Sequence, residues 1–310
     1  MAHNGHRHAH GHGHALSPEA DRGRLLIALA LILGFMAVEV AAGVAAHSLA
    51  LLSDAAHMLT DAGAIGLSLI AMRLAERAPA GGLTFGLKRA EVLSALVNGV
   101  SLCVLGGLIV YEAVRRLFQP GRLDGRAMVV VAVVGIGVNL AAAWQMARAE
   151  RRSLNVEGSY QHILTDLYAF VGTAVAGVVV LATGFVRADA IASLLVAVLM
   201  LRAAYGLLRA AGRVLLEAAP EGIVPQEIAA AIASHPSVSN VHDLHVWEIT
   251  SGFPALSAHI LVKPGDDCHA VRRDLEKVLG ERFHIAHTTM QVDHAGERQL
   301  LSIPPFANPG

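Results

Sequence analysis

Length, composition and charge exclude most classes of soluble protein for this chain. It has 310 residues, of which 54% are hydrophobic and 16% carry a charge, and its mean hydropathy is +0.52. A soluble domain seldom combines so many apolar residues with so few charges, so the composition indicates a membrane protein. The formal net charge of -1 argues against a nucleic-acid partner, which would have to be attracted by a general basic field.

The N-terminus is rich in histidine: the chain has 17 of these residues, and six lie within its first 14 positions. They are His3, His6, His8, His10, His12 and His14. The stretch lacks the apolar core and cleavage site of a signal peptide, and its composition cannot bury a core. We therefore expect residues 1–24 to form a disordered tail in the cytosol. Alternating histidine and small residues bind zinc or nickel weakly, so the tail either collects metal or is dispensable.

Six apolar stretches are each long enough to cross a bilayer as a helix, which takes about 20 residues. They lie near 25–46, 49–72, 92–114, 127–147, 163–186 and 190–208. Small residues occur throughout these stretches, as close packing between helices in lipid requires. The sequence therefore predicts a six-helix transmembrane bundle over residues 25–212.

Basic residues in the short flanks of the spans predict their orientation. Lys and Arg gather before the first span, after the second and after the fourth. The loop between the first and second spans has none, and the loop between the fifth and sixth has only Arg187. The loop after the third span is an exception, because it carries Arg115, Arg116, Arg122 and Arg126. The balance predicts that both termini lie in the cytoplasm.

The composition changes after Pro220, where polar residues become frequent. "VPQEIAAAIASHPSV" and "DDCHAVRRDLEKVLGERF" are typical of helices, and "VHDLHVWEI", "ALSAHILVK" and "TTMQVDH" of strands. The order α-β-β-α-β predicts a small, ferredoxin-like α/β domain in the cytosol over residues 213–297, with a flexible tail over 298–310. The two cysteines, Cys103 and Cys268, are too few for a disulfide framework or a cysteine-based zinc finger.

Two similar pentapeptides, "HMLTD" at 57–61 and "HILTD" at 162–166, place ionisable side chains inside apolar runs. His57 and Asp61 are four residues apart and share one face of a helix, as do His162 and Asp166. Two helices meeting on these faces would bring together two imidazoles and two carboxylates, a donor set that suits tetrahedral zinc. Ionisable groups at membrane depth are costly and usually mark a transport path or a ligand site. The pattern therefore predicts an intramembrane zinc site.

The alternative for each pair is a simple hydrogen bond across a helix interface. One pair alone would leave these two interpretations equal, whereas two matching pairs favour the metal site. Asp54 lies one turn before His57 and fits a supporting or entry role better than that of a ligand. Glu39 and Asn139 also lie inside spans, and each fits an ordinary packing residue equally well.

Two functions other than transport would also use a zinc site at membrane depth. An intramembrane zinc metalloenzyme would need an open coordination position and a general base, and the sequence has no HExxH motif. A membrane metal sensor would bind zinc in its cytosolic domain without moving it. Metal flux into sealed vesicles distinguishes these functions, because a sensor gives no flux and an enzyme turns over a substrate.

Several longer stretches resemble those of one family. "SLALLSDAAHMLTDAGA", "TFGLKRAEVLSALVNG" and "HILTDLYAFVGTAVAG" resemble the second-helix, loop-to-third-helix and fifth-helix signatures of the cation diffusion facilitator family. "VHDLHVW", "SAHILV" and "HTTMQVD" resemble its cytosolic domain. The resemblance covers roughly residues 20–295 and is greatest to the bacterial zinc and cadmium branch. The paired HxxxD motifs are its most specific part.

This resemblance implies a homodimeric secondary transporter in the bacterial inner membrane, which exports a divalent metal from the cytoplasm in exchange for protons. The intramembrane site carried over from the family consists of His57, Asp61, His162 and Asp166. In the family, an Asp in place of the helix-two His often accompanies broader use of zinc and cadmium. The two histidines here therefore favour zinc as the substrate, with cadmium and cobalt as further candidates.

The resemblance also implies zinc as a structural or regulatory ion of the cytosolic domain. The matching ligand positions are His242, His259 and Asp293, and the alternative for each is an ordinary surface residue of a strand. Further candidates are His245, His287 and the pair Cys268–His269. The loop "AERAPAGGLTFG" between the second and third spans has no His or Asp, so we expect no metal site there.

One charge pair of the family is also matched, at the junction of the membrane and cytosolic parts. Arg89 precedes the third span and Glu217 follows the sixth. Opposite charges at these positions would form a hinge or a dimer contact. The alternative is two solvated charges at the edge of the membrane, which contribute little.

Overall fold

A computed structural model describes residues 18–45, 49–119, 125–148 and 153–295. Within its helices, the side chains of a few residues, including Glu39 and those of 49–57, are not described. Residue contacts divide the chain into two units, Met1–Gly212 and Arg213–Gly310, and each unit is considered by itself. The histidine-rich segment before Pro18 lies outside the described residues, as does the predicted C-terminal tail.

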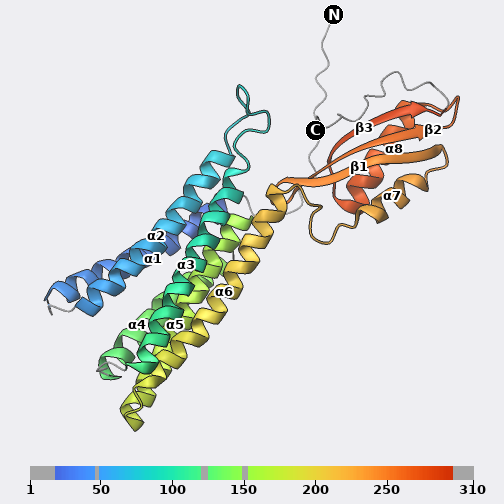
Figure 1. Ribbon diagram of the computed structural model, residues 1–310. Helices are drawn as coiled ribbons and strands as arrows, with labels where there is room; N and C mark the ends of the chain where they lie inside the picture. The colour runs from blue at the N-terminus through green and yellow to red at the C-terminus, as the bar shows by residue number, and fades with distance from the viewer. Residues whose placement is uncertain (1–17, 46–48, 120–124, 149–152, 296–310) are drawn as a thin grey trace, which may run out of the picture. The chain divides into compact units, whose positions relative to one another are not determined.

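Six long helices follow one another along the first unit (Figure 1). They are α1 (Pro18–Ala45), α2 (Leu49–Ala75), α3 (Ala90–Phe118), α4 (Gly125–Ala147), α5 (Leu154–Thr183) and α6 (Arg187–Leu215). Over the described residues, α3, α4, α5 and α6 are long and apolar enough to cross a membrane. The prediction of a helical transmembrane domain is confirmed, and each predicted span corresponds to one of the six helices.

Two helix starts differ from the predicted spans. Helix α5 begins at Leu154, nine residues before the predicted start at 163, because Ser153 caps it: the backbone N–H of Asn155 donates to the Ser153 hydroxyl over 3.3 Å. His162 therefore lies about two turns inside α5 rather than before it. Helix α1 begins at Pro18, so the last seven residues of the predicted disordered tail, 18–24, are helical.

The buried core of the first unit is shared by α1, α2, α4 and α5. Its buried members include Ile32, Ile65, Met146 and Ile163, one from each of these helices. Helices α3 and α6 meet through a smaller cluster of Leu102, Met200 and Ala204. Two glycines of α3 permit this contact: a Cβ on Gly99 would lie 2.9 Å from Leu208, and one on Gly106 would lie 2.9 Å from Leu201. Such close approach at small residues is typical of helices that pack in lipid.

Large apolar side chains also cover the outside of these helices. Val130, Val175, Leu195 and Val198 are each more than half exposed. Water does not favour a surface of this kind, whereas the hydrocarbon of a bilayer does. The exposed apolar surface and the buried core together are those of a helix bundle surrounded by lipid.

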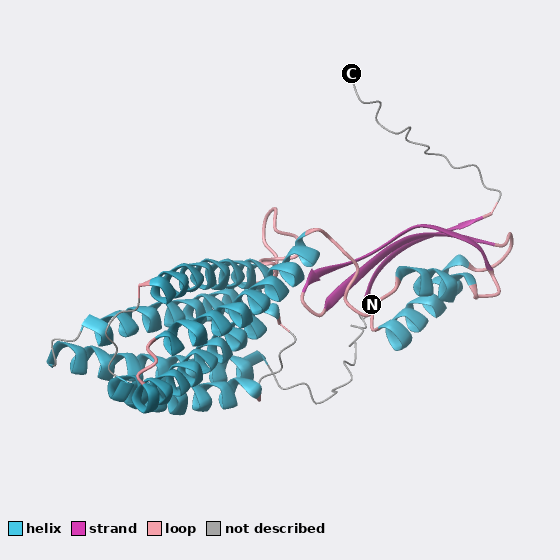
Figure 2. Ribbon diagram, turned by 60° about the horizontal axis from the view of Figure 1, so that its bottom comes forward, coloured by secondary structure: helices cyan, strands magenta, loops and turns pink. Residues whose placement is uncertain are grey.

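The second unit contains the predicted order of elements, which is confirmed. They are α7 (Pro225–Ala233), β1 (Val238–Thr250), β2 (Phe253–Val262), α8 (Cys268–Phe283) and β3 (His287–His294). The sheet has the order β1-β2-β3, in which β2 pairs antiparallel with β1 and parallel with β3. Helices α7 and α8 lie on the same face of this sheet (Figure 2). Ile228, Ile260 and Leu275 are buried between the helices and the strands, so this unit has its own core. The opposite face is free to carry polar side chains.

Candidate metal sites

Helices α2 and α5 bring three of the four predicted intramembrane ligands together. Asp61 comes from α2, and His162 and Asp166 lie one turn apart on α5. The imidazole and the two carboxylates each offer one ligand atom, and these atoms all lie within 4.8 Å of one another. Within the described part of the chain, no other three His, Cys, Asp or Glu residues lie so close. A single small cation has room to contact all three groups.

Burial makes these polar groups expensive unless they are paired. His162 is 2% exposed, and the side chain of Asp61 is 14% exposed. His162 Nε2 lies 2.6 Å from Asp61 Oδ1, at a distance typical of a charge-assisted hydrogen bond. The other ring nitrogen, His162 Nδ1, is buried and has no hydrogen-bond partner among the described residues. The pair is thus partly satisfied within the protein and retains a donor or acceptor for a further ligand.

The fourth predicted ligand, His57, is placed only through its backbone. It lies in α2 one turn before Asp61, so the two residues are on the same face of that helix. The side chain of His57 lies outside the described residues, and so does that of Asp54. The membership of His57 in the site therefore stays a prediction.

Asn139, which the sequence left unassigned, is buried and donates to the backbone carbonyl of Gly135 over 3.1 Å, as a packing residue of α4 does.

Sequence analysis missed a buried polar cluster one turn from this site, formed by Ser68, Asn98, Asn155 and Ser159. The hydroxyls of Ser68 and Ser159 are 2.7 Å apart, and Asn98 Nδ2 donates to Ser68 Oγ over 3.4 Å. Asn155 Nδ2 donates to the backbone carbonyl of Ser68 over 2.8 Å. The sequence did contain a signal, because Asn155, Ser159, His162 and Asp166 follow one another at spacings of four, three and four, which places them on one face of α5.

Two oxygen atoms of this region are buried without a hydrogen-bond partner among the described residues. They are Asn155 Oδ1 and the hydroxyl of Ser94, which lies one turn before Asn98 on α3. An unpaired buried polar atom costs about 1–3 kcal/mol, so in native proteins it usually faces a water or a ligand. The polar cluster therefore has unused capacity to bind water or a cation along α2, α3 and α5.

In the second unit, the pairing of β1 with β2 places His242 directly opposite His259. Their rings meet edge to face, with centroids 5.4 Å apart. His242 Nδ1 is buried and has no hydrogen-bond partner among the described residues. Two imidazoles on one face of a sheet, one of them with an unpaired nitrogen, are suited to bind a transition metal.

A bulge in β1 adds Asp243 and His245 to this histidine pair. The strand register shifts between His242 and His245, and Asp243 takes a left-handed φ of 53°, which Asp tolerates better than most residues. His245 Nε2 donates to Asp243 Oδ1 over 3.0 Å, and His259 Nε2 lies 3.9 Å from Asp243 Oδ2. The hydrogen bond from His245 lowers the pKa of Asp243, so its carboxylate is ionised near neutral pH. Asp243 was not predicted from the sequence.

The other predicted cytosolic ligands have different neighbours. Asp293 pairs in register with Leu261, and its carboxylate accepts from Gln291 Nε2 over 2.7 Å. Its carboxylate and the imidazoles of His242 and His259 are not within 4.8 Å of one another in the described structure. His287, at the start of β3, has its ring against Phe253.

Cys268 and His269, considered from the sequence for a second metal site, lie at the start of α8. The Sγ of Cys268 lies 3.6 Å from His294 Nε2. The backbone N–H of His269 donates to Asp267 Oδ1 over 2.8 Å in the N-terminal cap of the helix, and a metal site at this pair stays a prediction. Arg89 immediately precedes α3, and Glu217 follows α6. Arg89 and Glu217 belong to different units, so the ion pair between them stays a prediction.

Two family models match the chain, one for each unit. The model of the cation efflux transmembrane domain matches residues 25–216. The model of the cytoplasmic domain of cation efflux proteins matches residues 220–295. The first match contains Asp61, His162 and Asp166, and the second contains the histidine pair of β1 and β2.

Individual relatives are similar over nearly their whole length. The chain is 36% identical over 292 residues to the cadmium, cobalt and zinc/H(+)-K(+) antiporter of Bacillus subtilis, which covers 92% of this chain and 94% of that protein. It is 37% identical over 281 residues to the zinc transporter ZitB of Escherichia coli, covering 90% of each. It is 36% identical over 282 residues to the metal cation efflux system protein CzcD of Cupriavidus metallidurans, covering 90% of this chain and 88% of that protein.

Proposed function

Because the chain belongs to the cation efflux family, also called the cation diffusion facilitators, we propose that it exports zinc from the cytoplasm in exchange for protons. The family makes it an integral membrane transporter of metal cations rather than an enzyme. Zinc appears in the names of the relatives from Bacillus subtilis and Escherichia coli, and cadmium and cobalt in that of the first. We assign zinc as the main substrate and cadmium and cobalt as further substrates.

The observation that supports this proposal most directly is the convergence of Asp61, His162 and Asp166 inside two helices of the membrane domain. Two carboxylates balance the double charge of a divalent cation, so the ion leaves water without leaving an uncompensated charge in a poorly polarisable interior. An imidazole nitrogen adds selectivity for zinc over the harder cations magnesium and calcium. We propose His57 as the fourth ligand, which completes a tetrahedral His2Asp2 site.

Proton exchange follows from the requirement that metal and protons use the same ligand atoms. A metal needs neutral imidazole and ionised carboxylate, so its binding displaces protons from these groups. Imidazole is the better proton carrier near neutral pH, because its ordinary pKa is about 6.5, against about 3.9 for Asp. In the proton-loaded form, His162 donates Nε2–H to Asp61, which is the contact of 2.6 Å in the structure. Zinc replaces that proton between the two side chains.

We propose that zinc reaches the site from the cytoplasm along the buried polar cluster. Ser68 and Ser159 lie toward the C-terminal end of α2 and the N-terminal end of α5, and the basic loops predict that these ends face the cytoplasm. The unpaired oxygens Asn155 Oδ1 and Ser94 Oγ supply sites for hydrated or partly dehydrated ions on the way. Release on the opposite side requires the helices to close one access route and open another. We propose this orientation, with both termini in the cytoplasm, in the bacterial inner membrane.

In the cytosolic domain, we propose that zinc binds as a resident ion and stabilises a homodimer. His242 and His259 would hold it, with a carboxylate from Asp243 or Asp293 as the third ligand. The unpaired His242 Nδ1 and the ionised Asp243 carboxylate suit such an ion. Bound zinc would supply a link between β1 and β2 and would neutralise the carboxylate. We propose Arg89 and Glu217 as the charge pair between the membrane and cytosolic parts.

Purified protein in sealed vesicles tests the transport proposal. A zinc-sensitive dye and a pH-sensitive dye trapped in the same vesicles report both fluxes. Zinc entry should be accompanied by proton exit, and an opposing pH gradient of the correct sign should accelerate it. His162→Ala should abolish both signals while the protein keeps its elution volume in size-exclusion chromatography. Zinc flux without a pH change would refute exchange, and parental flux in the variant would refute the site.

A further inference from the structure

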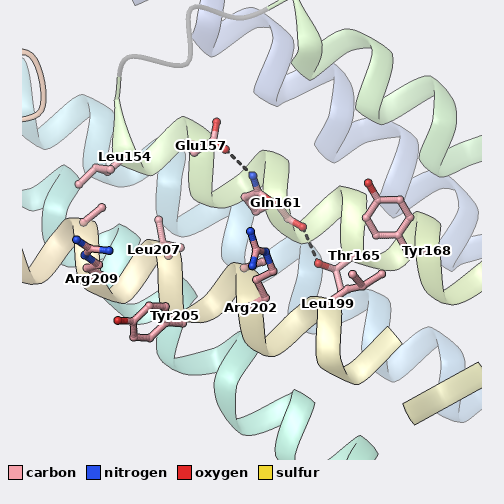
Figure 3. A pocket seen from close by; sticks show the side chains of 13 residues that line it. Leu154, Glu157, Gln161, Thr165, Tyr168, Leu199, Arg202, Tyr205, Leu207 and Arg209 are labelled. Atoms are coloured by element: carbon pink, nitrogen blue, oxygen red, sulfur yellow. Dashed lines mark hydrogen bonds between the residues drawn. The ribbon is translucent and has the colours of Figure 1, made fainter. Parts of the chain in front are cut away.

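A second feature of the membrane domain is a cavity of about 630 Å³ between α5 and α6 (Figure 3). Helix α5 contributes Leu154, Glu157, Gln161, Thr165 and Tyr168 to its wall. These residues follow one another at spacings of three or four, so they form one face of α5. His162 and Asp166 are not among the residues that line the cavity. The cavity is therefore distinct from the proposed metal site.

Helix α6 contributes two arginines, Arg202 and Arg209, which are seven residues apart and so lie on one face. Both side chains extend from α6 toward α5 (Figure 3). Among the residues that the structure describes, neither guanidinium has a hydrogen bond or an ion pair. Within the predicted span 190–208, Arg202 lies six residues, or about 9 Å, before the end, and Arg209 directly follows that end. A cation at that depth in a bilayer is costly and needs an anionic partner.

The acidic and polar groups on the α5 side of the cavity do not supply an anionic partner for Arg202 or Arg209. The Glu157 carboxylate accepts a hydrogen bond from Gln161 Nε2 at 2.6 Å, and the Thr165 hydroxyl donates to the Gln161 carbonyl at 2.8 Å. With Arg202, Arg209 and Glu157 ionised, the wall carries a net charge of about +1. Two guanidinium groups repel a divalent cation, so this cavity does not suit the transported metal. Its charge complements an anion.

The remaining wall suits a hydrocarbon chain. Leu199, Ala203, Gly206 and Leu207 of α6 line the cavity between and beside the arginines, and small residues leave room for a chain to lie against the helix. Tyr205 is 66% exposed on the same helix, and tyrosine is common where apolar and polar parts of a bilayer meet. The cavity thus offers guanidinium donors beside an apolar wall that runs along the helices.

We propose that this cavity binds an anionic phospholipid, whose phosphate is held by Arg202 and Arg209 and whose acyl chain lies against the apolar part of α6. Arg binds phosphate oxygens through paired, charge-assisted hydrogen bonds, and basic pockets between transmembrane helices are known sites for anionic lipid head groups. This site goes beyond metal transport and does not depend on it. Because α5 carries His162 and Asp166 on another face, bound lipid also contacts the helix that provides the metal ligands.

The experiment is lipid binding to the full-length purified protein, measured by native mass spectrometry. Phosphatidylglycerol and phosphatidylcholine are titrated separately, because they share acyl chains and phosphate but differ in net charge. The parental protein should bind phosphatidylglycerol at least tenfold more tightly than phosphatidylcholine. The double variant Arg202→Gln, Arg209→Gln should lose about tenfold or more of its affinity for phosphatidylglycerol, since two charge-assisted contacts are removed. The control Arg187→Gln, at the other end of α6, should bind it as the parent does.

Two further measurements make each outcome decisive. Arg202→Lys keeps the charge but loses the paired donors, so it should bind phosphatidylglycerol more weakly than the parent and more tightly than the double variant; an affinity as low as that of the double variant would overturn an electrostatic site. Inorganic phosphate at equal concentration should not displace the lipid, because it lacks the acyl chain, and efficient displacement would overturn the lipid assignment. If the double variant binds phosphatidylglycerol normally but dissociates from dimer to monomer in light scattering, the cavity is a contact between two copies of the chain, and the proposal is wrong.

Discussion

Asp61→Asn tests whether negative charge, rather than shape, makes the intramembrane site. Asparagine has nearly the volume of aspartate and keeps a hydrogen-bonding oxygen near His162 Nε2, which lies 2.6 Å from Asp61 Oδ1. The substitution therefore preserves the packing of α2 on α5 and removes one unit of charge. Any large loss of zinc affinity then reports the charge of the site.

The magnitude follows from the burial of the pair. Removing one partner of a buried, hydrogen-bonded charge pair costs about 3–5 kcal/mol. At about 1.4 kcal/mol for each tenfold change, zinc binding should weaken by roughly 140- to 4,000-fold. The Asp61 side chain is 14% exposed, so water replaces part of the lost interaction, and we expect the lower end of this range.

The assay is the initial rate of zinc uptake into sealed vesicles as a function of zinc concentration. Asp61→Asn should raise the half-saturating concentration about 100-fold, or abolish flux over the accessible range. Asp189→Asn is the matched control, because it removes a carboxylate that lies 3.2 Å from Arg116 outside the site. Such a partly exposed pair contributes about 1 kcal/mol or less, so the control should change the half-saturating concentration less than about fivefold. Equal values for the two variants would refute the charge argument.

Three further predictions concern residues outside that pair. Deleting residues 2–15 should leave uptake at saturating zinc nearly unchanged, because a tail outside the membrane does not form the path; complete loss of flux at normal expression would contradict this. In the isolated domain 213–310, zinc should raise the melting temperature, and His242→Ala with His259→Ala should remove this effect, because an ion stabilises only the state that binds it. His57→Asp should increase cadmium flux relative to zinc flux in the same vesicles, and an unchanged ratio would show that His57 does not set selectivity.

The sequence predicted which residues meet in the membrane domain better than how they meet. The repeated spacing of four placed His162 and Asp166 on one helix face, and the structure brings Asp61 to that face. The close contact between His162 and Asp61 depends on the rotation of α2 against α5, which the spacing within one helix does not determine. The early start of α5 was missed because Glu157, Gln161 and His162 lower the hydropathy of its first turns. The hydrogen bond from Asn155 N–H to the Ser153 hydroxyl caps the helix at this point, so α5 begins here despite its polar first turns.

In the cytosolic domain too, the sequence predicted the elements but not every side chain that their pairing brings together. The alternating strands of the sequence predicted the hairpin, and its register places His242 opposite His259. The bulge that adds Asp243 was not predicted, because it requires a left-handed backbone that only the twist and pairing of the formed sheet select. The two facing histidines could be predicted as candidate ligands, whereas the carboxylate of Asp243 beside them could not.

Either zinc or protons can balance the negative charges of the intramembrane site. Without either, Asp61 and Asp166 would leave two negative charges in a region that water barely reaches, so the empty, deprotonated site should be the least stable form during the return step. Protons on the imidazoles reduce that charge and permit the return, and raising the pH on the release side removes the protons that the site needs. A higher pH on that side should therefore slow steady-state zinc transport several-fold, while the first turnover after mixing with zinc stays nearly unchanged. Rapid-mixing fluorescence in vesicles separates the two phases, and equal slowing of both would show that protons act on zinc binding rather than on the return of the empty site.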